Sequence, residues 1–355
     1  MFTGYPSSYN VVPLSLDHEP EVCIDMLKDI DSGKDSSSLQ AALVWAAESV
    51  CDGNSAGLEL ARFLLEKLML EKDADVNAVV AVGDGNENTA LWWAVRAVWA
   101  GKAGGLELAK LLVENGADVN AVGVEGSGKE STPLWLAASA VHMGRAGAPE
   151  LATLLVEHEA DVDAVGVDRG GNESTPLHWA AGGACDGKAG GLELVKLLLE
   201  NGADINTVGA DGARRARAVE GTPLWWAAQA VWAGRAGGLK VAVFLVKEGA
   251  RVDAVGDGGD GCKFTPLWWA ARAACDGVAG GLELVTLLVE QGADVNVAGR
   301  LRDGDECTPL CLAARAVRKN TAGGPELVRL LLSAGARLAQ SEKDEQGIVD
   351  TAAVS

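Results

Sequence analysis

The chain has 355 residues and a formal net charge of −20 at pH 7. An acidic chain repels polyphosphate, which disfavours generic binding to nucleic acid or to anionic membranes. No apolar run approaches the roughly 20 residues that span a bilayer, and residues 1–20 lack the basic start and apolar stretch of a secretory signal.

We expect the chain to have three parts. Residues 1–37 form an N-terminal segment, in which 20–27 reads as a helix that caps the first repeat. Residues 38–337 hold an array of about seven repeats, and such arrays need end caps with a polar face. Residues 338–355 form a polar tail without a copy of the second helix, which we expect to be partly disordered.

The array is marked by a recurring threonine. The copies are Thr89, Thr132, Thr175, Thr222, Thr265 and Thr308, at gaps of 43, 43, 47, 43 and 43 residues. A degenerate copy with Ala41 in the same slot lies 48 residues before Thr89. Repetition at such a period predicts a solenoid, because one unit cannot bury its apolar face alone and neighbours must stack.

The first helix of each repeat begins after the threonine. Threonine is a good N-cap and the proline that usually follows suits the first helical position. Leu91, Ala94, Val95 and Val98 lie at i, i+3, i+4 and i+7, and the other copies hold small apolar residues in these slots. This spacing predicts a helix of about eleven residues with one buried face, which ends at Gly101 and its equivalents.

The second helix begins 17 residues after the threonine slot in all seven copies. In the copy at 106–114, Leu108, Leu111 and Leu112 face the core and the charged residues face solvent. Asn115 and Gly116 end this helix, and glycine recurs at that stop. A polar, glycine-rich loop of about a dozen residues then leads to the next threonine.

These segments resemble the ankyrin repeat, as in 265–296, which reads Thr-Pro-Leu, then Leu-Glu-Leu-Val, then Gly-Ala-Asp-Val-Asn. The resemblance implies an all-α, ankyrin-type solenoid of helix–turn–helix repeats with long hairpin-like loops, acting as a non-catalytic scaffold for protein binding. The family period is near 33, so we expect a lengthened first helix and deeper loops. The family's histidine persists only as His178, so its hydrogen bond is not carried over to the other repeats.

One face of the first helices varies from repeat to repeat. It consists of the first tryptophan slot and the slots four and seven residues later, and we call it the variable stripe. Ankyrin proteins bind partners on this side, and tryptophan and arginine are enriched in binding hot spots. The candidate partner-binding residues are Trp92, Arg96, Trp99, Trp135, Ser139, His142, Trp225, Gln229, Trp232, Trp268, Arg272, Arg315 and Arg318.

The tryptophans have two interpretations, packing between repeats or exposure to a partner. We expect the second tryptophan of each pair to pack, as for Trp93, Trp179, Trp226 and Trp269. For Trp92, Trp225 and Trp268 both interpretations stay open. Trp99 and Trp232 lie near helix ends and are expected to be exposed.

No catalytic, cofactor or metal constellation is evident. His142 and His178 would lack a third metal ligand, and Cys307 and Cys311 lack the partners of a zinc site. Repeat-related cysteines lie too far apart for disulfides, which indicates reduced thiols in a cytosolic or nuclear protein. The basic loop 214–217 reads either as a docking site for an acidic peptide or as a solvated loop.

We therefore expect a scaffold that binds a partner protein through the variable stripe and the hairpin loops. The alternative is a structural protein that associates weakly with itself through exposed tryptophans and the array ends.

Overall fold

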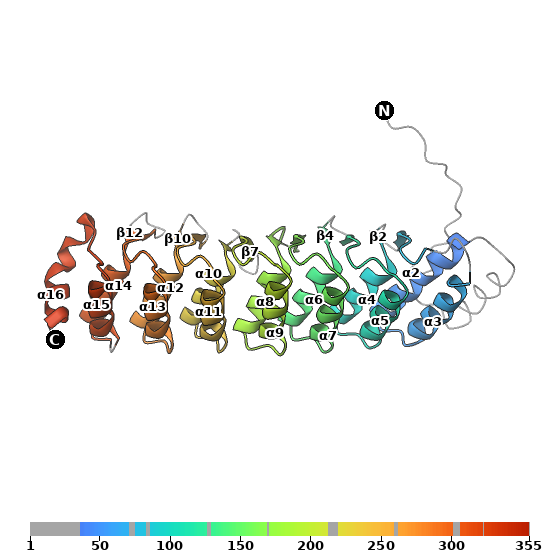
Figure 1. Cartoon of the computed structure of the whole chain (residues 1–355), viewed down its shortest axis with the longest axis horizontal. Helices are drawn as coiled ribbons and strands as arrows, with labels where there is room; N and C mark the ends of the chain where they lie inside the picture. Colours follow the sequence, from blue (N-terminus) through green and yellow to red (C-terminus); the bar gives the residue numbers. More distant parts are fainter. Residues whose placement is uncertain are drawn as a thin grey trace, which may run out of the picture.

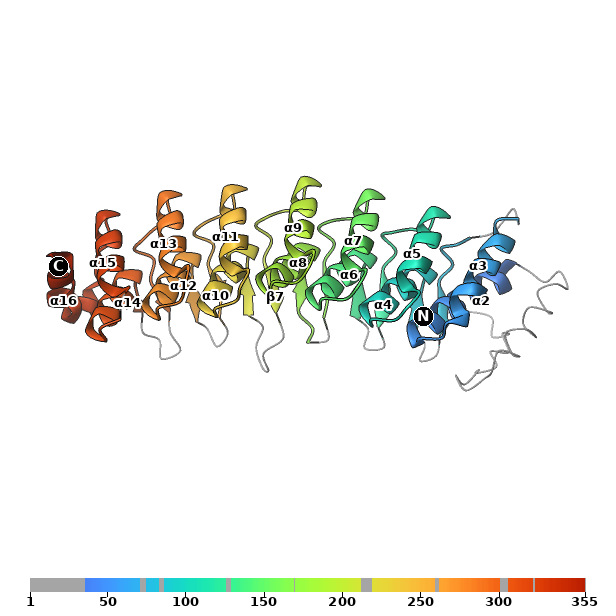
Figure 2. The ribbon, with the colours of Figure 1, turned by 90° about the horizontal axis from the view of Figure 1, so that it is seen from below.

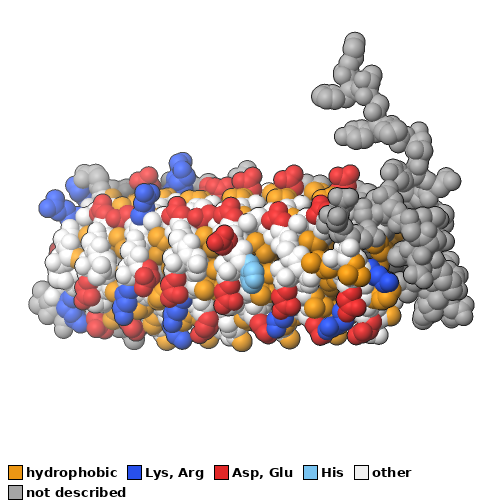
Figure 3. Space-filling view, turned by 45° about the vertical axis from the view of Figure 1, so that its right-hand side comes forward, with side chains coloured by type: hydrophobic (Ala, Val, Ile, Leu, Met, Phe, Trp, Pro, Cys, Tyr) orange, Lys and Arg blue, Asp and Glu red, His pale blue; other side chains and the backbone are white. Residues whose placement is uncertain are grey.

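The computed structural model describes residues 36–354 apart from 71–74, 83–85, 126–128, 169, 212–218, 259–261, 301–305 and 322. It is an elongated stack of helix pairs, with short hairpins along one edge (Figure 1). The two helices of each pair form two parallel rows (Figure 2), and acidic side chains are spread along the array (Figure 3). The predicted solenoid is thus confirmed. The predicted cap at 20–27 and the basic loop 214–217 lie outside the described residues.

The helices follow the sequence periodicity. The first helices are α2 (Ser36–Asp52), α4 (Ala90–Trp99), α6 (Pro133–His142), α8 (Pro176–Cys185), α10 (Pro223–Trp232), α12 (Pro266–Cys275) and α14 (Pro309–Arg318). The second helices are α3 (Ala56–Leu68), α5 (Gly105–Glu114), α7 (Ala148–Glu157), α9 (Gly191–Glu200), α11 (Gly238–Lys247), α13 (Gly281–Glu290) and α15 (Gly324–Ser333). No helix in the described part of the chain is long and apolar enough to cross a membrane.

The helix boundaries have local causes. In α4 the Thr89 hydroxyl accepts the backbone N–H of Trp92 at 3.2 Å, and Thr132, Thr222, Thr265 and Thr308 cap their helices in the same way. After α4, Gly101 has φ of +73°, a left-handed conformation that glycine adopts without strain. The leucine and alanine slots that recur in the first helices are fully buried, and this burial of apolar surface supplies most of the stabilisation of the fold.

Short antiparallel hairpins join consecutive repeats. Their strands are β1 (Val80–Val82), β2 (Asn86–Asn88), β3 (Gly123–Glu125), β4 (Lys129–Ser131), β5 (Gly166–Val167), β6 (Glu173–Ser174), β7 (Gly209–Asp211), β8 (Val219–Gly221), β9 (Gly256–Asp257), β10 (Lys263–Phe264), β11 (Gly299–Arg300) and β12 (Glu306–Cys307). The last three hairpins merge into one six-stranded sheet from β7 to β12. Between β2 and β3 the buried Asn88 amide bridges instead, through both backbone groups of Val124, at 3.0 and 2.7 Å.

A polar ladder ties the loops of successive repeats together. Each rung runs from a side-chain oxygen of Asn or Asp to a backbone N–H in the next repeat, as from Asn120 to Asp161 at 2.7 Å. The accepting residues are Asn77, Asn120, Asp163, Asn206, Asp253 and Asn296. The rungs satisfy backbone donors that the loop conformation leaves without a strand partner.

The C-terminal tail is helical, contrary to the expectation of partial disorder. It forms the 3-10 helix η1 (Gln340–Glu345) and α16 (Gln346–Val354), which pack on α14 and α15. The reason is a short apolar face, in which Val349 and Ala352 are buried at helical spacing. Glu342 is also buried and accepts hydrogen bonds from the Thr308 backbone N–H and hydroxyl, at 2.7 and 2.8 Å.

A glycine at the start of five of the six described hairpins, all but β1–β2, makes room for the large residue in the first slot of the variable stripe. A Cβ added to Gly166 would lie 2.6 Å from the indole of Trp135, and one added to Gly256 would lie 2.6 Å from that of Trp225. Gly123, Gly209 and Gly299 face Trp92, His178 and Trp268 in the same way.

We predict that Gly166→Ala lowers the free energy of unfolding by about 1–3 kcal/mol, since the indole must shift within a packed core. Urea unfolding followed by circular dichroism measures this change. Combining the substitution with Trp135→Leu should cost less than the sum of the two single changes, because the ring that clashes is gone.

Gly347→Ala is the matched control. No atom lies within 4 Å of a Cβ at this helical position, so the stability should stay the same or rise slightly. Equal stability of Gly166→Ala and Gly347→Ala would contradict the steric role of Gly166.

Candidate functional site

The first slot of the variable stripe belongs to the core. Trp92, Trp135, Trp225 and Trp268 are 1%, 5%, 0% and 4% exposed. The prediction of Trp92, Trp225 and Trp268 as partner contacts is therefore corrected, whereas Trp135 also reaches the groove described below. Each indole N–H instead donates to the next repeat. Trp225 bonds the Phe264 carbonyl at 2.8 Å, and Trp268, Trp135 and Trp92 bond residues in the equivalent position. A buried indole N–H is stabilised by such a partner, and in this slot the neighbouring repeat supplies it.

His178 makes the same link with an imidazole. Its Nε2 lies 3.3 Å from the Gly221 carbonyl and its Nδ1 accepts the backbone N–H of Thr175, so the ring is neutral with the proton on Nε2. Burial lowers the pKa of His178 from 6.5 to about 4, although hydrogen bonds to carbonyls oppose the shift. Tryptophan and histidine therefore serve one purpose in this slot, and the hydrogen bond that seemed lost with the histidine is retained.

The second tryptophans pack as predicted. The ring of Trp93 meets that of Trp92 edge-on at 5.2 Å, and Trp179 meets Trp135 of the preceding repeat at 5.5 Å. Trp269 is buried against Trp225.

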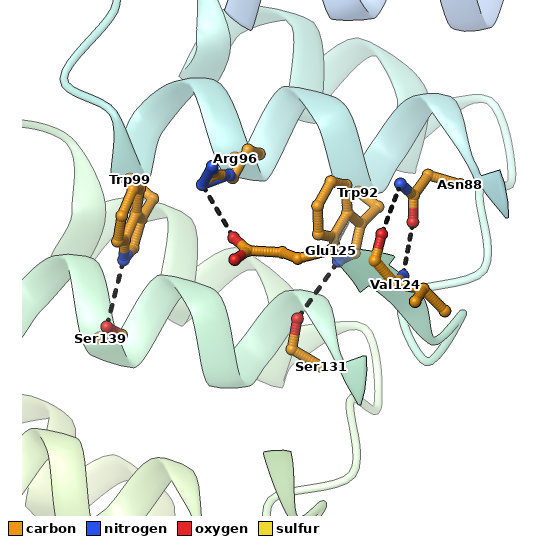
Figure 4. Close-up of polar contacts among 8 residues, drawn as sticks. All are labelled: Asn88, Trp92, Arg96, Trp99, Val124, Glu125, Ser131 and Ser139. Atoms are coloured by element: carbon orange, nitrogen blue, oxygen red, sulfur yellow. Dashed lines mark hydrogen bonds and ion pairs between the residues drawn. The ribbon is translucent and has the colours of Figure 1, made fainter. Parts of the chain in front are cut away.

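At the N-terminal side of the stripe, Arg96 and Trp99 are committed to contacts within the array (Figure 4). Arg96 forms an ion pair with Glu125 at 2.9 Å and lies over the Trp99 ring, 4.5 Å from its centroid. The Trp99 indole donates to Ser139 in the next repeat at 3.2 Å. Trp99 is half-buried, so it is less exposed than expected.

The C-terminal side of the stripe is committed in a similar way. Trp232 and Arg272 both donate to Asp276, at 3.0 and 2.8 Å, and Trp232 is half-buried against Trp269. Burial raises the pKa of Asp276, but the hydrogen bonds from Arg272 and Trp232 outweigh it and the net pKa is lowered. Arg318 pairs with Glu345 of the C-terminal cap at 2.8 Å.

Between these regions the stripe opens into a groove of about 750 Å³ over α4, α6, α8 and α10. We call it the central groove. Its apolar floor is built from Trp99, Trp135, Trp179 and Trp226. Its edges are the hairpins on one side, with Lys129 and Asp168 among their residues, and the interhelical turns on the other, with Met143, Asp186, Lys188 and Arg235.

The groove exists because the middle slot of the stripe is small in two successive repeats. This slot holds Ser139 in α6 and Gly182 in α8, whereas the other repeats hold the longer side chains of Glu48, Arg96, Gln229, Arg272 and Arg315 there. His142 closes part of the space, with its ring 5.3 Å from that of Trp179. The run of two small residues between longer ones is visible in the sequence, but helical periodicity does not predict that it opens a groove.

The structure thus sorts the predicted site residues. Trp99, Ser139, His142 and Gln229 line the central groove, and Trp135 adds one edge of its ring. Trp179, Trp226, Met143 and Lys188 also line it but were not predicted as contacts, because their slots seemed to belong to the packing between repeats or to the turns. Trp232, Arg272, Arg315 and Arg318 lie outside the groove lining.

Three comparisons with known proteins bear on this chain. A family model for ankyrin repeats, which spans three copies, matches residues 98–209 and 190–298. Among solved structures, the chain is similar to the Legionella pneumophila effector AnkC, with 16% identity, 86% of this chain and 88% of that chain covered, and a TM-score of 0.51. No curated protein matches the sequence.

Two further solved structures are similar at lower TM-scores. One is EF0377, an ankyrin repeat protein, with 22% identity, 72% of this chain and 98% of that chain covered, and a TM-score of 0.46. The other is a chain in the complex of Bd0816, a predatory endopeptidase from Bdellovibrio bacteriovorus, with immunity protein Bd3460, with 20% identity, 70% and 97% coverage and a TM-score of 0.41. At these identities the likeness concerns the fold alone.

The buried imidazole predicts a pH-dependent joint. Between pH 6.5 and about 4, His178 is protonated in the unfolded chain but stays neutral in the folded protein. The free energy of unfolding therefore decreases as the pH falls through this window. The shift corresponds to about 3 kcal/mol at most. Urea unfolding at pH 7 and pH 4.5 should show a larger loss for the wild type than for His178→Gln, in which the carboxylates still titrate. Parallel losses in the two proteins would refute this role.

Proposed function

This chain belongs to the ankyrin repeat family, and we propose that it is a non-catalytic scaffold that binds a partner protein through the central groove. Ankyrin repeats generally mediate protein binding. The observation that supports this groove as the binding site is an apolar floor of tryptophan rings, which lies where Ser139 and Gly182 leave space between the longer side chains of Arg96 and Gln229.

The groove is preorganised. The Trp99 indole is fixed by Ser139, and the Trp179 ring is fixed between Trp135 and His142. Side chains that are held before binding lose little conformational entropy when a partner arrives. Aromatic rings also provide large apolar area at low entropic cost, which is why they act as binding anchors.

The chemistry of the groove indicates the kind of segment that fits. The floor takes one or two apolar side chains above Gly182, and both signs of charge stand at the edges, with Lys129 and Lys188 facing a groove that also holds Asp168. We therefore propose a partner segment with an apolar centre and polar flanks of mixed charge.

The alternative is self-association through exposed tryptophans and the array ends. All 11 tryptophans are described, and each is buried or half-buried. The structure therefore gives self-association less support than it gives partner binding.

Gly182→Arg tests the proposal. Arginine occupies this slot in three other repeats, so the substitution should fill the groove while the array stays folded. A random-peptide library displayed on phage, selected against the immobilised full chain, should yield peptides that bind the wild type. Their affinity for Gly182→Arg should fall at least tenfold, or by about 1.4 kcal/mol.

Gly182→Ala is the matched control, because it adds one methyl group at the same position and leaves most of the groove free. A Cβ there would lie 3.1 Å from Nδ1 of the His142 ring, a contact that a shift of the ring by a few tenths of an ångström relieves. Peptides that bind the wild type and Gly182→Arg equally well, with circular dichroism showing both folded, would place binding elsewhere and refute the proposal.

A further inference from the structure

The last repeat holds a buried group of two thiols and one carboxylate, which is separate from the central groove. Cys307 ends β12, Cys311 lies in the first turn of α14, and Glu342 lies on η1 of the C-terminal cap. All three residues are buried, and their donor atoms lie within 4.8 Å of one another. The sequence provided the two cysteines without a third partner, and the fold of the tail supplies it.

The end of the array explains why these residues meet. Cys311 takes the slot that holds a large ring in most earlier repeats, so the space filled elsewhere by an indole is free for a smaller group. No further hairpin follows α15 among the described residues, and Glu342 enters at this place from the cap. Among the described residues, its Oε1 accepts the Thr308 N–H alone, whereas Oε2 accepts both the Thr308 hydroxyl and the Ala339 N–H.

We propose that Cys307, Cys311 and Glu342 bind one zinc ion that fastens the C-terminal cap to the last repeat. Two thiolates and one carboxylate are established zinc ligands, with bonds of about 2.3 Å to sulfur and about 2.1 Å to oxygen. Donor atoms around a tetrahedral ion stand about 3.5 Å apart. The observed cluster reaches this geometry by small side-chain rotations, and a water molecule completes the fourth position.

The coordination bonds balance as follows. Each thiol loses its proton to solvent and its sulfur donates a lone pair to zinc, while Glu342 donates a lone pair from Oε1, which has accepted a single hydrogen bond. The bound ion then leaves one net negative charge on the site. Arg315 interacts with both cysteines and with Glu342 and can offset that charge. The N-terminus of α14 also favours the thiolates through the helix dipole.

The two thiols lie close to each other. A hydrogen bond from Cys311 holds the pKa of Cys307 below its usual value, although burial opposes this shift, and the same bond together with burial raises the pKa of Cys311. By contrast, burial is the largest influence on Cys185 and raises its pKa to about 12. Cys185 lies in α8, remote from the cluster, and so provides a matched control thiol.

The test uses the full chain, reduced with a phosphine and stripped of metal with a chelator. Cobalt(II) added to the wild type should give the intense thiolate-to-cobalt absorption of tetrahedral sulfur ligation at one ion per chain. Zinc should displace the cobalt and raise the melting temperature. Hydrogen exchange in η1 and α16 should slow when zinc is bound, because the ion joins the cap to the repeat.

Variants at each ligand separate the zinc site from adventitious binding. Cys311→Ser should weaken zinc binding by roughly 100-fold, and Glu342→Gln by roughly tenfold, since serine and an amide are poor zinc ligands. Cys185→Ser should bind zinc like the wild type. Circular dichroism without metal shows whether each variant is folded, and Glu342→Gln keeps both thiols should Cys311→Ser fail to fold.

Two results would overturn the proposal. One is cobalt binding without thiolate absorption. The other is zinc affinity that is the same in the wild type and in a folded variant with both Cys307 and Cys311 changed to serine. Neither result bears on the partner-binding groove, so the two proposals stand or fall separately.

Discussion

The fold depends on one repeated constraint, the burial between two repeats of a large aromatic ring that carries a polar N–H group. The ring of Trp225 fits only because Gly256 has no side chain, and its N–H must find an acceptor because water cannot reach it. The Phe264 carbonyl of the next repeat meets that need. Each ring thereby fixes the distance and angle between its own repeat and the next, and the stack of cores follows from this spacing.

The same constraint determines where the surface can vary. The buried rings that link neighbouring repeats occupy the first slot of the variable stripe. Towards the two ends of the array, side chains in the middle and third slots form pairs within the array, such as Arg96 with Glu125 and Trp232 with Asp276. In the proposed function, recognition takes place at the repeats in which the middle slot is small, at Ser139 and Gly182. The groove is thus a local omission in an otherwise continuous set of contacts between repeats.

The fold was largely predictable because its signals repeat. The threonine caps, the leucine faces and the glycine stops recur at fixed spacing, and the helices from α3 to α15 begin within two residues of the expected positions. Helix α2 is the exception, because it begins at Ser36, before the Ala41 slot. The side-chain roles were harder to predict, because Trp92 and Trp99 lie on the same helix face and periodicity cannot separate a core ring from a half-buried one. The meeting of Glu342 with Cys311 depends on how the tail folds back, and no local pattern encodes that contact.

Two sets of hydrogen bonds join successive repeats, one from the buried rings and one from the polar ladder. They share a property that bears on how such an array can grow. In most joints a side chain of one repeat bonds a backbone group of the next, as Trp135 bonds the Ser174 carbonyl and Asn120 bonds the Asp161 amide. A backbone acceptor or donor is present whatever the neighbour's side chain. A duplicated or deleted 43-residue unit would therefore meet a compatible neighbour at once, so the length of the array can change by whole repeats without a matching change in sequence.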